Sequence, residues 1–471
     1  MSLINRLLQQ ISGHSRSHRT RRREWLSPFG IQAAQVQTLE SRRLLSALTV
    51  TIAADSGHGS LRDEIAHAKS GDTINFASSL KGQTITLTSG ELLINKGLTI
   101  QGPGASQLTI SGGNHSRVFD VTASQPVVLT GLTISNGDSF GEGGGIFNAG
   151  GSHLTVSACT ISNSRADNGG GIYNDFGGTV TLSACNISGD SAGLGAGFYN
   201  AGRSNLTVSA ISNCHVAGIV GGSGQGGGIF NEGTLAMTDC TLSGDVSDGT
   251  GDYFGGGGIF NTGTLTASGC TLSGDSATSG MGGGIYSAGG SVTLTNCTLA
   301  GDIADGYIDP GLGGGLYVSS GSASLTNCTI SLNRAVGYGG GIAVALAPVN
   351  VTLVNTIVAG NTVGTVQGST EQARGADVFG VFSTADHNLI GNGTGANIYN
   401  GNIVGGFSSP VINAMLGPLQ NNGGPTMTMA LLAGSPAIGQ ADSGLAPLTD
   451  QRGVTRRDLP GEFTDIGAFE V

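Results

Sequence analysis

The hexapeptide GGGIFN at Gly143–Asn148 decides the fold, because the chain returns to it at a nearly constant interval. Close variants follow one another roughly every 27 residues, and they begin at Gly169, Gly195, Gly226, Gly256, Gly282, Gly313 and Gly339. A period of this length is typical of solenoid proteins, in which each repeat packs only against its neighbours. We therefore interpret the repeats as stacked coils before assigning chemistry to any residue.

A second phrase recurs between the hexapeptides. It reads LTVSACTIS at Leu154, and variants begin at Val180, Leu265 and Val292. Apolar and polar residues alternate over short runs, which is the pattern of strands and not of helices. Three short strands per repeat predict an all-β fold, a right-handed parallel β-helix of the pectin-lyase-like type with roughly a dozen coils.

The composition narrows the class of partner. The net charge is −11, but residues 1–50 hold eight Arg against Glu24 and Glu40, so this segment carries +6 and the remainder −17. An acidic body with only three Lys argues against nucleic acid as a partner. Because no run of 18 apolar residues occurs, we expect no transmembrane segment.

The N-terminal region lies outside the repeats. The stretch LESRRLLSA at Leu39–Ala47 resembles a short N-terminal motif of secreted planctomycete proteins. This resemblance implies that 1–47 is a targeting segment and that the protein is secreted or displayed at the cell surface or outer membrane. A disordered basic tail is the alternative interpretation.

We expect an N-terminal cap and the first coils over 48–136. Leu61, Ile65 and Ala68 fall at helical spacing, and the stretch DTINF at Asp72–Phe76 alternates like a strand. This segment is similar to the beginning of many bacterial repeat-rich surface proteins. A short helix over the first coil would cover its unpaired strand edges.

The regular repeats occupy 137–361, and the last coils and a C-terminal tail occupy 362–471. The Gly-Gly-Gly-Ile repeats resemble those of chlamydial polymorphic outer-membrane proteins. The tail, from LGPLQNNGG at Leu416 to DIGAFEV at the end of the chain, resembles the choice-of-anchor Q domain of bacterial β-helix proteins. Both resemblances imply a surface-associated β-helix and say little about activity.

Six of the seven cysteines share one register of the repeat. They are Cys159, Cys185, Cys240, Cys270, Cys297 and Cys328. Cys214 departs from this register and aligns with Ser164. Because the register position is flanked by inward apolar residues, we expect a buried ladder of free thiols that behave as small hydrophobes. A disulfide or metal role is the alternative, although no CxxC motif occurs.

A column of acidic residues lies five positions beyond the register cysteines, and three of its members belong to adjacent repeats: Asp245, Asp275 and Asp302. Carboxylates on adjacent coils would stand ~4.8 Å apart. One hypothesis is that Ca²⁺ relieves their repulsion, since hard cations bind carboxylate oxygens. The alternative is that these residues simply cap solvated turns.

A column of aromatic residues follows the isoleucine of each hexapeptide. Its members are Phe147, Tyr173, Tyr199, Phe230, Phe260, Tyr286 and Tyr317. If the isoleucines face inward, the period of two sends these rings outward, where they could stack on sugars. If the isoleucines face outward instead, the rings pack in the core. Tyr253 and Tyr307, on inserted loops, are further candidate ligand contacts.

The sequence favours a non-enzymatic protein with a structural or adhesive role that binds glycans or another cell-surface component on its lateral face. We identify no catalytic residues, because the motifs of galacturonan hydrolases of this fold are absent and cations are scarce among the repeats. A diverged polysaccharide lyase or hydrolase is the alternative. Ice or mineral binding is a third hypothesis, based on a threonine column at Thr241, Thr271, Thr298 and Thr329.

Overall fold

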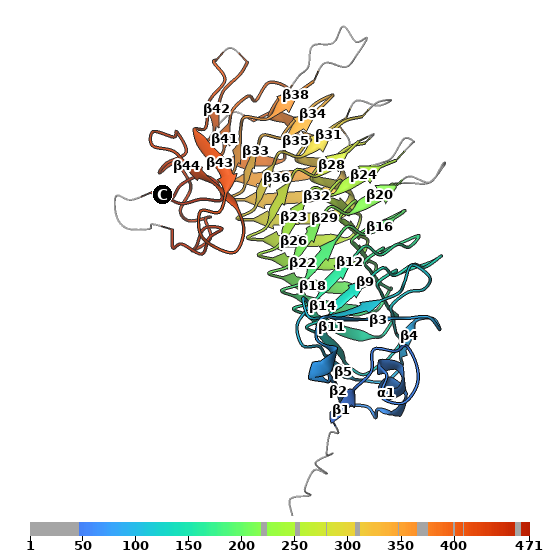
Figure 1. Cartoon of the computed structure of the whole chain (residues 1–471). Helices are drawn as coiled ribbons and strands as arrows, with labels where there is room; N and C mark the ends of the chain where they lie inside the picture. Colours follow the sequence, from blue (N-terminus) through green and yellow to red (C-terminus); the bar gives the residue numbers. More distant parts are fainter. Residues whose placement is uncertain are drawn as a thin grey trace, which may run out of the picture. The chain divides into compact units, whose positions relative to one another are not determined.

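The computed structural model describes residues 47–217, 224–249, 255–278, 280–306, 311–346, 348–364, 375–398, 401–407, 409–456 and 463–471. Residues 45–471 make up one compact unit, and its described part is a parallel β-helix, so the predicted fold is confirmed (Figure 1). The predicted targeting segment lies outside the described residues except for Ala47. None of the helices in the described residues has the length and hydrophobicity of a membrane-spanning segment.

Each regular coil consists of four short strands. In one such coil, β13 (Ile172–Asn174) and β14 (Thr179–Ser183) form the first and second arms of sheet A, β15 (Asn186–Ser188) belongs to sheet B, and β16 (Ser191–Ala192) to sheet C. Equivalent strands of successive coils pair in parallel. The three sheets contain 22, 13 and 7 strands.

The remaining strands follow the same order along the chain. The first arm of sheet A also contains β4 (Leu92–Ile94), β7 (Phe119–Val121), β10 (Ile146–Asn148), β17 (Phe198–Asn200), β21 (Ile229–Asn231), β25 (Ile259–Asn261), β35 (Ile342–Val344) and β39 (Val378–Phe379). The second arm also contains β1 (Ala47–Val50), β2 (Thr73–Phe76), β5 (Thr99–Gln101), β8 (Val127–Thr130), β11 (His153–Ser157), β18 (Arg203–Thr207), β22 (Thr234–Thr238), β26 (Thr264–Ser268), β36 (Asn350–Val354) and β40 (Thr384–Asp386). Both arms merge in β29 (Ile285–Thr295) and β32 (Leu316–Thr326).

Sheets B and C complete the coils. Sheet B also contains β3 (Gln83–Thr86), β6 (Leu108–Ser111), β9 (Thr133–Ser135), β12 (Thr160–Ser162), β19 (Ala210–Ser212), β23 (Thr241–Ser243), β27 (Thr271–Ser273), β30 (Thr298–Ala300), β33 (Thr329–Ser331), β37 (Ile357–Val358), β41 (Leu389–Ile390) and β42 (Ile403–Val404). Sheet C also contains β20 (His215–Ala217), β24 (Val246–Asp248), β28 (Ser276–Ala277), β31 (Ile303–Ala304), β34 (Arg334–Ala335) and β38 (Thr362–Val363).

The register of the stacked strands produces columns of like residues. Ile146 pairs with Ile172, which pairs with Phe198, and all three are fully buried in the interior core. The prediction of a buried cysteine ladder is confirmed, because all seven thiols are free and buried. Cys214 lies outside this ladder, as predicted, in the column of the aspartates.

A ladder of buried asparagines ends the first arm of successive coils, and sequence reasoning missed it. Asn148 donates from Nδ2 to Asn174 Oδ1 at 2.8 Å, and the pattern continues through Asn200 and Asn231 to Asn261. Each side-chain amide from Asn148 to Asn231 therefore donates a hydrogen bond to the next one, at the corner where the two arms meet. This pairing explains why the hexapeptide ends in Asn.

A short helix lies where the sequence predicts the N-terminal cap. Helix α1 (Leu61–His67) begins at Ser60, whose hydroxyl accepts the N–H of Asp63, and it buries Leu61 and Ile65. At the other end of the helix, Lys96 Nζ donates to the carbonyl oxygens of Ile65, Ala66 and Ala68, the last at 2.9 Å. A 3₁₀ turn follows at η2 (Ser78–Leu80).

The C-terminal segment folds back against the coils and does not extend the stack. It contains an antiparallel pair, β43 (Leu416–Gln420) and β44 (Thr428–Leu431), and lies beside later coils of the solenoid (Figure 1). Its apolar residues share a second core with the solenoid, in which Leu431 and Ile466 pack with Ile357 and Leu389.

Candidate functional site

The predicted aromatic column exists and points away from the interior core. The rings from Phe147 to Tyr317 stack in order with centroid separations between 4.7 and 5.7 Å. Their mutual stacking hides most of their surface, since every ring from Tyr199 onward is at most 8% exposed. Only Phe147 and Tyr173, at the beginning of the column, are partly exposed.

Neighbouring apolar side chains cover the column further. Leu194, Met281 and Leu312 pack against the rings, and Ala343 takes the next position in the register. The column therefore offers few free ring faces for stacking on a ligand. Tyr253 and Tyr307 lie outside the described residues.

The aspartates of the calcium hypothesis line up inside the solenoid. Asp245, Asp275 and Asp302 have no exposed surface. The N–H of Asp245 donates to Asp275 Oδ1 at 2.9 Å, and the N–H of Asp275 donates to Asp302 Oδ1 at 3.0 Å. Each carboxyl group therefore accepts a backbone hydrogen bond from the preceding coil, which gives the column a structural role.

The second carboxyl oxygen of each aspartate has no hydrogen-bond partner in the described part of the chain. It packs against the third glycine of a hexapeptide, where a Cβ on Gly258 would lie 2.8 Å from Asp275 Oδ2. Burial raises the pKa of Asp245 to about 8 and that of Asp302 to about 7. Burial and the charges of its two neighbours raise the pKa of Asp275 well above its usual range.

These observations give the calcium hypothesis no support. A carboxyl group must be ionised to bind a metal ion well, whereas burial favours the protonated form of these three. Across the described ranges, no three His, Cys, Asp or Glu side chains converge as metal ligands do.

A groove crosses four coils at the corner between the two arms of sheet A. Four residues, 175–178, separate β13 from β14, whereas only two separate the arms in the next three coils, at 201–202, 232–233 and 262–263. The longer turn therefore stands as a wall above the shorter ones. The resulting groove has a volume of ≈ 620 Å³, a size typical of ligand sites.

Phe176 forms the top of this wall. The N–H of Gly178 donates to the carbonyl oxygen of Asp175 at 2.9 Å and closes a β-turn. Gly177, with a φ of 80°, takes the position that requires a left-handed backbone. The turn holds the Phe176 ring 83% exposed, an arrangement that leaves an aromatic face free for a ligand.

The groove has a backbone floor. Gly202, Gly233 and Gly263 stack so closely that a Cβ on Gly233 would lie 2.0 Å from the carbonyl oxygen of Gly202. Side chains are therefore excluded there, and Arg203 and Glu232 stand exposed at the edges. Sequence reasoning missed this site, although the differing turn lengths after each hexapeptide were a readable signal.

The lining of the groove suits binding better than bond cleavage. Among the described residues that line it, the only ionisable ones are Arg203 and Glu232. Glycoside hydrolysis generally needs two carboxyl groups, and a calcium site needs several oxygen ligands. An exposed ring, a backbone floor, threonine hydroxyls and one residue of each charge can instead hold a polar ligand.

The C-terminal segment covers most of the threonine column on which the ice- or mineral-binding hypothesis was based. Thr271 donates to the carbonyl oxygen of Met427 at 2.6 Å, and Thr298 donates to Gln451 Oε1 at 2.6 Å. Thr329 accepts the N–H of Ala468 at 3.1 Å. The C-terminal segment therefore occupies the surface that the hypothesis needs.

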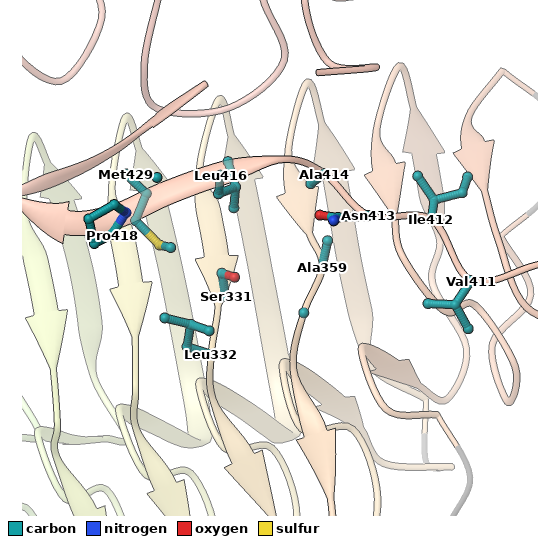
Figure 2. Close-up of a pocket in the computed structure, with 12 residues that line it drawn as sticks. Ser331, Leu332, Ala359, Val411, Ile412, Asn413, Ala414, Leu416, Pro418 and Met429 are labelled. Carbon is teal, nitrogen blue, oxygen red and sulfur yellow. The ribbon is translucent and has the colours of Figure 1, made fainter. Parts of the chain in front are cut away.

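A second cavity, of about 390 Å³, lies where the C-terminal segment crosses the coils. Figure 2 shows Leu332 and Ala359 of the solenoid opposite Leu416 and Met429 of the tail. The described residues that line it include no ionisable side chain. We interpret it as a packing gap beneath the tail, with no chemistry of its own.

Comparisons with known proteins give fold-level similarity alone. No family model and no curated protein matches the chain. Among solved structures, pectate lyase Pel9A aligns with a TM-score of 0.39 and 12% identity, over 90% of this chain and 97% of that one. A mannuronic acid specific polysaccharide family 6 lyase from human gut microbiota aligns with a TM-score of 0.35 and 11% identity, over 72% and 86% of the two chains.

Proposed function

We propose that the protein is a non-enzymatic binding protein that holds glycans in the lateral groove beside Phe176. The observation that carries this proposal is the groove itself, ≈ 620 Å³ across four coils, with an exposed aromatic ring and a side-chain-free floor. An exposed phenyl ring offers an apolar face on which the C–H face of a sugar ring can stack.

The same proposal covers the role and location of the protein. We place it outside the cytoplasm, in a structural or adhesive role at the cell surface, on the resemblance of 1–47 to secreted planctomycete proteins. The resemblance of the tail to choice-of-anchor Q domains supports association with the envelope. A diverged lyase or hydrolase is the alternative, and the test below includes it.

The test is a glycan array on the full chain, followed by an assay for reducing sugars and unsaturated products. We expect retention of at least one polysaccharide without product. Phe176→Ala should weaken binding about tenfold, which is about 1.4 kcal/mol. Phe140→Ala is the matched control, because Phe140 is fully exposed yet does not line the groove.

Three outcomes would overturn the proposal. Formation of product would indicate the enzymatic alternative. Equal binding by wild type and Phe176→Ala, or no glycan bound by wild type, would remove the groove as the binding site.

A further inference from the structure

The groove runs along the direction in which the coils stack. Thr179, Arg203, Thr234 and Thr264 line one side of it and pair in register on β14, β18, β22 and β26. Adjacent strands lie ~4.8 Å apart, so three steps span ~14 Å. A ligand that fills the groove must therefore be extended across several strands.

A column of hydroxyl groups runs parallel to the groove on the same outward face. Its members are Thr130, Ser157, Ser183, Thr207, Thr238, Ser268, Thr295 and Thr326, in register over eight successive coils. Thr238 is exposed and the other seven are partly exposed. Each hydroxyl can both donate and accept a hydrogen bond, and none carries a charge.

The charges around the groove disfavour an anionic ligand. Glu232 lines the groove. Burial, and after it the negative charges of Asp175, Glu142 and Glu232, raise the pKa of the nearby Tyr173 to about 12. Arg203 is the only cation among the described residues of the lining. A polyuronate has a negative charge on every sugar, and in the groove these charges would lie near the carboxylates and be repelled by them.

We infer that the groove and the hydroxyl column together bind an extended, uncharged polysaccharide and select it over polyuronates. This inference rests on the proposed function and names the ligand class for the same site. The repeating hydroxyls match a repeating ligand, because each coil presents the next hydroxyl at the strand spacing. The inference therefore extends the site beyond the groove to a neighbouring surface.

The experiment measures binding of the full chain to a neutral β-glucan and to polygalacturonate, each at low and at high salt. We expect the β-glucan to bind with little dependence on salt and the polygalacturonate not to bind. Thr238→Val should weaken β-glucan binding about threefold or more, as expected for one lost hydrogen bond. Thr241→Val, the same change on sheet B, should leave it unchanged.

The outcomes separate this inference from the proposed function. Salt-sensitive binding of polygalacturonate that Arg203→Gln abolishes would overturn the selectivity and leave glycan binding intact. Equal effects of Thr238→Val and Thr241→Val would overturn the role of the hydroxyl column. Binding of neither polymer, nor of any other glycan, would overturn the proposed function and this inference with it.

Discussion

Replacing Asp275 by Asn should stabilise the protein, and the gain should grow with pH. Asp275 has no exposed surface, and its Oδ2 atom has no hydrogen-bond partner among the described residues. Two asparagines already occupy the same column in later coils. Asn333 accepts the N–H of Asp302 at 2.8 Å and donates from Nδ2 to the carbonyl oxygen of Leu299 at 3.0 Å. The strand register places the carbonyl oxygen of Leu242 beside position 275 as that of Leu299 lies beside Asn333. An Asn side chain at 275 could therefore donate the same hydrogen bond.

The magnitude follows from the raised pKa. The pKa of Asp275 is higher in the folded state than in the unfolded state, where it is near 3.8. Its contribution to the free energy of unfolding is therefore fully present below pH 3.8 and is lost as the pH rises through the folded pKa. Each pH unit above 3.8 costs about 1.4 kcal/mol while Asp275 stays protonated. The upper limit at pH 7 is therefore about 4 kcal/mol. We expect Asp275→Asn to recover ~1–4 kcal/mol at neutral pH and almost nothing near pH 4.

The assay is urea denaturation of wild type and variant at about pH 4.5 and about pH 8.5. The midpoint of Asp275→Asn should exceed that of wild type only at the higher pH. Asn333→Asp is the matched control, because it adds a buried carboxyl to the same column and should be destabilising only at the higher pH. A lower midpoint for Asp275→Asn at both pH values would refute this reasoning. So would a rise in the wild-type midpoint with Ca²⁺ that the variant lacks, which would restore the calcium hypothesis.

Two further predictions concern the core and the tail. Cys270→Ser should change stability by less than about 1 kcal/mol, because Ser209 in the same column already accepts the N–H of Cys185 and donates to the carbonyl oxygen of Thr207. Cys270→Ala should lose ~1–3 kcal/mol in the same urea assay. Arg456→Met should destabilise by ~3–5 kcal/mol and expose the tail to protease, because it removes the cation that pairs with the buried Glu470 carboxylate at 2.9 Å. Arg334→Met, which breaks an exposed ion pair, should change stability by about 1 kcal/mol or less. If Arg456→Met and Arg334→Met destabilise equally, the stabilising role of the buried Arg456–Glu470 pair is refuted.

Repeat spacing made the solenoid predictable from sequence, as it did the cysteine ladder, because stacked coils place equivalent residues in contact. The position of Asp275 relative to solvent was harder to predict. It follows Gly274, whose left-handed backbone, with a φ of 67°, turns the next side chain inward. The spacing alone indicated only a corner of the coil.

Features that depend on contacts distant in sequence were not predictable. Gln451 reaches Thr298 across 153 residues, and no local pattern indicates that the tail returns to this face. The groove depends on a difference of two residues in turn length beside Phe176. That signal was present in the sequence, but it acquires meaning only when the stacking order of the coils is known.

The most direct test of the proposed function is a crystal structure of the full chain soaked with a neutral oligosaccharide that the array identifies. We predict sugar density along the groove, with one ring against Phe176 and the chain passing Thr234 and Thr264. Density confined to another surface, such as the part of sheet B that the tail leaves uncovered, would contradict the account.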